Sequence, residues 1–146
     1  MSKMIIPAVK SVKSNSSNSA TITVAPLQNG YGRTLGNSIR RVLLSYVEGA
    51  GATGFRIEGV SNEFSTIDGV LEDVVDITLA LKQLRFKFES DEPVILKLSK
   101  KGKGQVTAGD ITESGGVQVV NKELVICNLT DSKSNINMEI QVESGT

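Results

Sequence analysis

The sequence of 146 residues has no histidine, no tryptophan and one cysteine. Without an imidazole there is no Ser-His-Asp or Cys-His catalytic arrangement, no imidazole general base and no histidine-containing zinc or iron site. The single Cys127 cannot form an intrachain disulfide, so nothing points to a secreted, disulfide-stapled domain. These absences predict a cytoplasmic protein that does not use histidine-based chemistry.

The chain also lacks an excess of charge of either sign and a long apolar run. Its 16 lysines and arginines balance 16 aspartates and glutamates, which gives a formal net charge of zero. Because such a molecule has no overall positive field, we expect no binding of DNA by bulk electrostatics. The apolar stretch 4–9 is too short for a signal peptide, and no segment approaches the roughly 18 apolar residues of a membrane span. We therefore expect a soluble chain.

The first third of the chain predicts one strand and one helix. Residues 11–20 are rich in serine and asparagine, which is typical of a loop. Residues 21–25 form a short alternating β-branched run, which predicts a strand. After a turn, apolar side chains follow steps of three and four, which predicts a helix over 34–47 with Thr34 as its N-cap.

The predicted helix has two different faces, and Gly49 and Gly51 give it a place to end. Its apolar stripe, which something must cover, consists of Leu35, Ile39, Val42, Leu43, Tyr46 and Val47. The other face consists of Asn37, Arg40, Arg41 and Leu44. Two interpretations of that face stay open. It is a solvated surface with an incidental leucine, or it is a protein-docking face, because arginine and an apolar anchor are enriched in interface hot spots.

Acidic residues crowd the start of a second predicted helix at 70–81. They are Asp68, Glu72, Asp73 and Asp76, with Lys82 after the end of the helix. This order is the one that the helix macrodipole favours. At helical spacing Asp68, Glu72 and Asp76 also share a face, as a hard-cation site requires, so a small metal-dependent enzyme is an alternative. The lack of a companion set of ligands elsewhere favours a solvated acidic face.

From residue 84 onward the hydrophobic period is two, which predicts a mainly antiparallel β region. Residues 84–88 and 94–98 predict a β-hairpin around a turn at 90–93. Further strands are expected at 105–108, 117–120, 124–129 and 136–142, with turns at 100–104 and 115–116. Cys127 lies in the middle of one of these strands and is predicted to be a small buried hydrophobe rather than a nucleophile.

Three long motifs follow one another along the chain. They are PLQNGYGRTLGNSIRRVLLS at 26–45, GVSNEFSTIDGVLED at 59–73 and VTAGDIT at 106–112. In this order and spacing the chain, from about Thr21 to Glu143, resembles the N-terminal region of the α subunit of bacterial DNA-directed RNA polymerase. This resemblance is much more specific than any feature of the composition.

The resemblance implies an α+β fold in two parts. Residues 1–48 would form the first half of a dimerisation domain, as a strand plus an amphipathic helix. Residues 49–146 would form a mainly antiparallel β domain with one helix, inserted into the first and incomplete at its C-terminal end. Because family members continue beyond this region, the resemblance implies a truncated chain or a fragment. The DNA-binding C-terminal domain of the family lies outside it.

The resemblance also implies a non-catalytic role without a cofactor. In that family two α protomers form the platform on which the β and β′ subunits assemble, and the catalytic magnesium carboxylates belong to β′. The implied β-docking residues are Asn37, Arg40, Arg41, Leu44, Glu63, Ser65, Thr66, Asp68 and Glu72. The implied β′ contact is Lys82, and the implied dimer interface is Leu35, Ile39, Leu43 and Tyr46.

An alternative to the subunit role is a free-standing α+β protein-binding module that kept the fold. Such a module has to cover the apolar stripe of its first helix within the chain itself, for example with residues 4–9. Exposure of Leu35, Ile39 and Leu43 therefore distinguishes the two interpretations.

Overall fold

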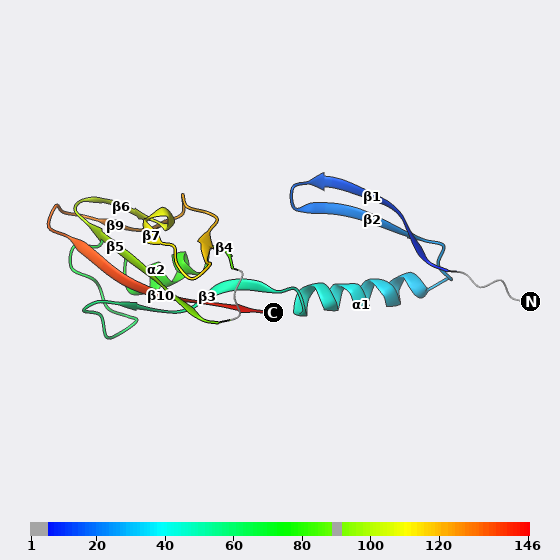
Figure 1. Ribbon diagram of the computed structural model, residues 1–146, viewed down its shortest axis with the longest axis horizontal. Helices are drawn as coiled ribbons and strands as arrows, with labels where there is room; N and C mark the ends of the chain where they lie inside the picture. Colours follow the sequence, from blue (N-terminus) through cyan, green and yellow to red (C-terminus); the bar gives the residue numbers. More distant parts are fainter. Residues whose placement is uncertain (1–5, 89–91) are drawn as a thin grey trace, which may run out of the picture. The chain divides into compact units, whose positions relative to one another are not determined.

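A computed structural model describes residues 6–88 and 92–146 and divides the chain into two compact units, Met1–Val47 and Glu48–Thr146. Unit 1 contains β1 (Ala8–Ser16), β2 (Ser19–Ala25) and α1 (Tyr31–Ser45), as labelled in Figure 1. Unit 2 contains β3 (Gly49–Ile57), α2 (Val74–Leu81), β4 (Phe86–Lys87), β5 (Val94–Lys101), β6 (Gly104–Thr107), the short 3₁₀ helix η1 (Ala108–Asp110), β7 (Ile111–Thr112), β8 (Gln118–Val119), β9 (Val125–Leu129) and β10 (Asn135–Gly145). The predicted α+β class with mostly antiparallel strands is confirmed.

The strands β1 and β2 form an antiparallel hairpin, so the prediction of a loop over residues 11–20 is wrong. Between Val9 and Ser11 the register advances two residues in β1 but one in β2, which makes Lys10 the extra residue of a β-bulge. The partners of Val9 and Val12 lie two residues apart in β2, so these valines share one face of the hairpin. Their spacing of three hides the strand period in the sequence. Unit 1 therefore has two strands where one was predicted.

The helix α1 begins three residues earlier than predicted. Its N-cap is Gly30, with φ of 82°, a conformation that glycine adopts without steric cost. Thr34 lies inside the helix, so its assignment as N-cap is wrong. The helix ends at Ser45, and the backbone N–H of the following Tyr46 donates to the carbonyl of Val42. Gly49 and Gly51 belong to β3, so they are not the helix stop that the sequence suggested.

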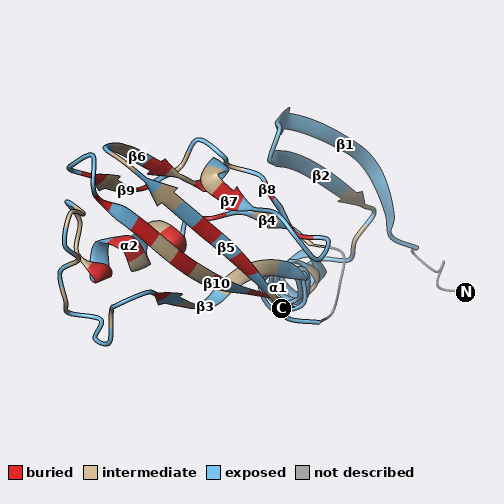
Figure 2. Cartoon of the chain, turned by 60° about the vertical axis from the view of Figure 1, so that its left-hand side comes forward, coloured by how far each residue is buried: buried red, intermediate tan, exposed pale blue. Residues whose placement is uncertain are grey.

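The core of unit 2 is built on a four-stranded antiparallel sheet in the order β3-β10-β5-β7. The central strand β10 pairs with β3 on one side and β5 on the other, and Ile140 lies opposite both Phe55 and Leu96. Figure 2 shows buried positions alternating along β10 and β5. The predicted final strand is confirmed, with its alternate residues Ile136, Met138, Ile140 and Val142 buried.

The predicted hairpin of residues 84–88 with 94–98 is wrong. Both edges of β5 are occupied, by β10 and by β7, and β4 pairs instead with β8 through Phe86 and Val119. Strand alternation shows which residues face a core but does not show which strand is the neighbour. Positions 90 and 91 of the predicted turn lie outside the described residues.

The helix α2 is shorter than the predicted 70–81, because residues 70 and 71 pair with β9 and the helix starts only at Val74. Val70 forms a β-bridge with Leu129, and the N–H of Leu71 donates to the carbonyl of Asn128 at 3.0 Å. The helix then starts at Val74, after the side chain of Asp73 accepts the N–H of Asp76 at 2.7 Å. Val70 and Leu71 thus pair with the neighbouring strand through their backbones instead of belonging to a helix.

The shorter predicted elements of unit 2 are confirmed within one or two residues, as β6, β8 and β9 with turns between them. Cys127 in β9 is fully buried, and this burial, together with the negative charge of Glu72, raises the pKa of its thiol to about 12. It therefore packs as a small hydrophobe, as predicted. In the described parts of the chain, no helix has the length and apolarity needed to span a bilayer.

Candidate functional site

The predicted docking face of α1 lies on one side of an exposed helix. Asn37, Arg40, Arg41 and Leu44 follow steps of three, one and three, which places them together on one side. All four are exposed, and Leu44 is 73% exposed. Within the described residues, neither arginine forms a hydrogen bond or ion pair through its side chain. The face therefore combines two unpaired cations with an apolar anchor.

The apolar stripe on the opposite side of α1 is also exposed. The helix has no buried residue; Leu35 is half-buried, Ile39 is 45% exposed and Leu43 is 61% exposed. Tyr46, predicted to lie in the same stripe, follows the end of the helix and is 73% exposed. Apolar side chains at this spacing are normally covered by another surface.

The free-standing module requires this stripe to be covered within the chain by residues 4–9. The described members of that segment do not cover it, since Ile6 is 71% exposed and Val9 is 61% exposed. Met4 and Ile5 lie outside the described residues. The exposure of the stripe disfavours the free-standing module.

A second candidate surface is the loop that precedes α2 in unit 2. The loop is attached to the helix by Ser65, whose carbonyl accepts the N–H of Val74 at 3.3 Å and whose hydroxyl donates to the carbonyl of Asn62. Its next fixed point is Gly69, with φ of 78°, where the carbonyl accepts the N–H of Thr130 at 3.0 Å. These bonds hold both ends of the loop, and between them Thr66 and Asp68 are exposed whereas Ile67 packs against the core.

Glu72 fixes the end of this loop to β9. Its two carboxylate oxygens accept the backbone N–H of Asn128 at 2.7 Å and the Asn128 side-chain amide at 2.6 Å. The prediction that Asp68, Glu72 and Asp76 share a helix face is wrong, because the helix starts only at Val74 and the Glu72 carboxylate is already bound. No group of acidic side chains in the described chain is arranged to hold a metal ion.

The other predicted docking residues of this loop differ in their accessibility. Glu63, Thr66 and Asp68 are exposed, whereas Ser65 is half-buried and bonded as above. Lys82, the implied β′ contact, is exposed at the C-terminal end of α2, where its backbone N–H donates to Thr78.

Sequence reasoning missed the apolar side chains beside these polar residues. Phe64 is 78% exposed and Leu71 is 71% exposed, and both flank the fixed points of the loop. On α2, Leu79 is 54% exposed and Val75 is 38% exposed, one helical turn apart. The predicted single helix over 70–81 does not distinguish its exposed apolar side chains from its buried ones. The signal that corrects this reading is Asp73, an N-cap residue in the middle of that run.

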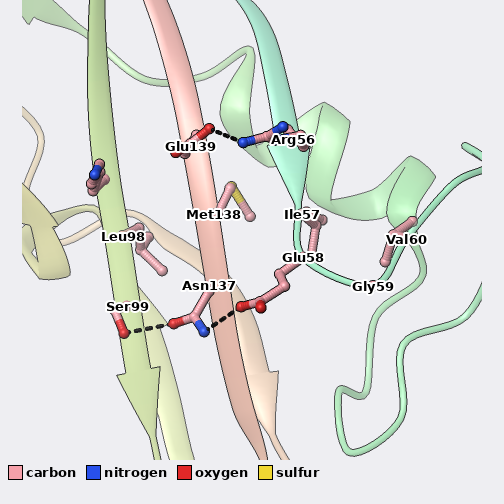
Figure 3. A pocket seen from close by; sticks show the side chains of 11 residues that line it. Arg56, Ile57, Glu58, Gly59, Val60, Leu98, Ser99, Asn137, Met138 and Glu139 are labelled. Atoms are coloured by element: carbon pink, nitrogen blue, oxygen red, sulfur yellow. Dashed lines mark hydrogen bonds and ion pairs between the residues drawn. The ribbon is translucent and has the colours of Figure 1, made fainter.

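A hollow of about 600 Å³ lies over β3, β10 and β5 in unit 2. Figure 3 shows polar side chains of the hollow, from Arg56, Glu58, Ser99, Asn137 and Glu139, paired across the three strands. Arg56 donates to Glu139 at 2.7 Å, and Asn137 donates to Glu58 and accepts from Ser99, each at 2.7 Å. These groups satisfy one another, so the hollow is the polar outer face of the sheet rather than a reactive site.

The VTAGDIT motif forms a turn around η1. Asp110 accepts the Lys100 ammonium at 2.6 Å and the backbone N–H of Thr107 at 2.8 Å. Partial burial would raise the pKa of Asp110, but the bonds from Lys100 and Thr107 outweigh it and lower the pKa below its ordinary value. The motif thus caps a turn and joins it to β5.

The two units carry opposite charge, which the whole-chain balance conceals. Residues 1–47 contain six lysines and arginines and no aspartate or glutamate, so their formal charge is +6. Residues 48–146 contain ten basic and sixteen acidic residues, so their formal charge is −6. The expectation of no overall positive field therefore describes the chain as a whole but not residues 1–47. Counting charge by unit instead of by chain reveals the separation.

Comparison with known protein families gives a match for unit 2. The sequence profile described as RNA polymerase Rpb3/RpoA insert domain matches residues 55–146. The matched region covers well over half of the chain and includes the loop before α2, the Glu72–Asn128 bond and Lys82.

Proposed function

The chain belongs to the RNA polymerase Rpb3/RpoA insert-domain family, and we propose that it acts as the non-catalytic α subunit of a DNA-directed RNA polymerase. In this role it provides a platform on which the β and β′ subunits assemble in the cytoplasm. Its own residues supply docking surfaces, and the nucleotidyl-transfer chemistry belongs to the larger subunits.

The observation that carries the proposal is the exposed face of α1. Arg40 and Arg41 have no ion-pair partner in the described chain, and Leu44 beside them is 73% exposed. Arginine and a large apolar side chain are residue types that contribute most of the binding energy in protein interfaces. We assign this face, with Asn37, to the docking of β.

In unit 2 the loop before α2 would extend the same docking function. Glu63, Thr66 and Asp68 are exposed, and the Glu72–Asn128 bonds hold the loop in place without leaving Glu72 free to bind a partner. Glu72 therefore acts on β through the loop instead of touching it. Lys82, at the far end of α2, is assigned to β′.

The proposed domain division, 1–48 and 49–146, is supported by the pairing of the strands at both ends of unit 2. Gly49 in β3 lies opposite Gly145 in β10, so the chain enters and leaves the unit at adjacent positions. A domain inserted into another requires this geometry, because both connections must reach the same neighbour.

The uncovered stripe of α1 supports a second α protomer as a further partner. Leu35, Ile39, Leu43 and Tyr46 would form the contact between protomers. A helix with an exposed apolar stripe is stabilised when another surface removes that stripe from water.

Co-purification with the β subunit encoded in the same genome tests the proposal. We expect Arg41→Ala to weaken association with β by about tenfold or more, because it truncates a docking side chain. The matched control is Lys133→Ala, an exposed cation of unit 2. If the unaltered chain retains neither β nor β′, the subunit role is wrong. If Arg41→Ala retains β as well as the unaltered chain does, the assignment of α1 is wrong.

A further inference from the structure

The cations of unit 1 have no acidic partner within their own unit. The unit contains no aspartate or glutamate, so Lys10, Lys13, Arg33, Arg40 and Arg41, all exposed, face water without a neighbouring carboxylate from the same unit. The ion pairs that the structure describes, such as Arg56–Glu139 and Lys100–Asp110, lie in unit 2. An unbalanced charge of +6 on so short a segment creates a strong local field.

These cations are mixed with exposed aliphatic side chains on both elements of unit 1. On α1, Leu44 lies one turn from Arg40 and Arg41. On the hairpin, Val12 and its partner Ile22 are 65% and 60% exposed, on the face opposite to that of Lys13. Removing such aliphatic groups from water favours association with a partner that is itself partly apolar.

The aromatic content of unit 1 argues against a nucleic acid as the partner. Surfaces that bind single strands stack bases on several aromatic rings, and unit 1 has Tyr31 and Tyr46 as its only aromatic residues. Duplex binding relies on contacts to phosphates, for which exposed leucine and valine side chains offer nothing. The combination of arginine with aliphatic anchors is typical of a protein interface.

We propose that unit 1 docks onto an acidic, partly apolar protein surface. Arg40 and Arg41 form the central charged contacts around Leu44, and the hairpin lysines Lys10 and Lys13 extend the positive surface. The inference rests on the proposed docking role of α1 and adds the chemistry of the surface that it meets.

The acidic stretch of unit 2 requires a different patch on the partner. Residues 57–81 contain six aspartates and glutamates and no lysine or arginine, and Phe64 and Leu71 are exposed within it. An acidic surface that attracts unit 1 repels this stretch. The large subunits therefore present two patches of opposite charge to one chain, which fixes the orientation of docking.

The first experiment is titration of the full chain with a polyglutamate peptide, followed by amide NMR. We expect resonances of α1 and the hairpin to shift, and those of residues 57–81 to stay in place, because like charges repel. Arg40→Glu with Arg41→Glu should abolish the shifts in α1. If the α1 resonances do not move, or if those of 57–81 move instead, the inference is wrong, whether or not the chain binds a polymerase subunit.

The second experiment measures the affinity of the full chain for purified β as salt is raised. We expect the Arg40→Glu, Arg41→Glu variant to bind β about thirtyfold more weakly near 50 mM NaCl, and the difference to shrink as salt screens the charges. The matched control, Lys103→Glu with Lys133→Glu, makes the same change of net charge in unit 2 and should alter affinity less than about threefold.

Three results separate the possible failures. No binding of the unaltered chain to β overturns the proposed function, and the polyglutamate titration still decides the inference. Equal binding by the charge-reversed variant overturns the inference together with the assignment of α1 to the docking of β, and leaves the subunit role standing. Displacement of β by a DNA duplex at physiological salt assigns unit 1 to nucleic acid and also overturns the inference.

Discussion

The two units of the chain differ in burial. Every residue that the structure describes as buried lies in unit 2, from Ile57 onward, whereas α1 in unit 1 has none. Yet unit 1 has a hairpin and a helix of fifteen residues, so these elements form without a buried core. The difference indicates that unit 2 provides its own stabilisation by apolar burial, whereas unit 1 has little such burial of its own.

The units differ in charge as well. Unit 2 places some of its charges in pairs, and in one case, Asp110 with Lys100, the pair is partly buried. Unit 1 has charge of one sign, and no opposite charge is present within the unit to form such pairs. The two units thus carry different patterns of both apolar and charged side chains.

The largest expected effect is the truncation of a leucine in the core of unit 2. Leu96 is fully buried, so Leu96→Ala should lower the free energy of unfolding by about 3 kcal/mol or more. Leu44 is 73% exposed, so Leu44→Ala should change it by less than about 0.5 kcal/mol. Chemical denaturation of the full chain measures both, and equal losses for the two leucines would contradict the comparison.

Loss of the Glu72 carboxylate should have the next largest effect, within unit 2. Glu72→Gln weakens two hydrogen bonds to Asn128, and we expect a loss of about 1–2 kcal/mol in unfolding free energy. Hydrogen exchange at the amides of Leu71 and Asn128 should accelerate, because these amides bond across the same junction. Glu63→Gln, at an exposed position of the same loop, is the control. Unchanged exchange in Glu72→Gln would show that the loop is held by other contacts.

Acid should act on unit 2 through Asp110. Because the folded pKa of Asp110 is lowered from 3.8, its stabilisation is present at neutral pH and is lost as pH falls below that value. We expect Asp110→Asn to cost about 1 kcal/mol at pH 7 and to flatten the decline of stability below about pH 4. Thermal unfolding across pH measures this, with Asp131→Asn as an exposed control. An unaltered acid profile in Asp110→Asn would contradict the assignment.

The smallest effects are expected for exposed arginines in either unit. In the Arg56–Glu139 ion pair the arginine side chain is 78% exposed and the glutamate side chain is 37% exposed. Arg56→Ala should therefore change the free energy of unfolding by less than about 0.5 kcal/mol. Arg41→Ala should leave stability equally unchanged while it weakens binding to β. Differential scanning calorimetry checks both variants. A large loss of stability for Arg41→Ala would mean that its effect on binding is indirect.

Much of unit 2 could be predicted from its sequence. The alternation through Ile136, Met138, Ile140 and Val142 predicted a strand with one buried face, because a period of two has no other simple explanation. The pairing of that strand could not be predicted, since several apolar strands compete for the same neighbour. The start of α2 was wrongly predicted for the same reason. The hydrogen bond between Leu71 and Asn128 joins residues that are far apart in the chain.

In unit 1 the helix was predicted with its docking face, whereas β1 was missed because the bulge at Lys10 shifts Val9 and Val12 out of the period of two. In the candidate site, exposure of Arg40, Arg41 and Leu44 followed from their helical spacing. The hydrogen bonds between Glu72 and Asn128 could not be predicted, because the sequence does not show which N–H groups will lie next to a carboxylate in the fold.

By itself the sequence determined the class of the fold, the two faces of α1 and the family, because periodicity and motifs are local along the chain. Tertiary structure decided which strands pair, where α2 begins and which acidic residues are already bound, because those outcomes depend on contacts between distant segments. The separation of charge can be counted from the sequence, but only the structure supplies the boundary at Val47 between the two units that carry the opposite charges.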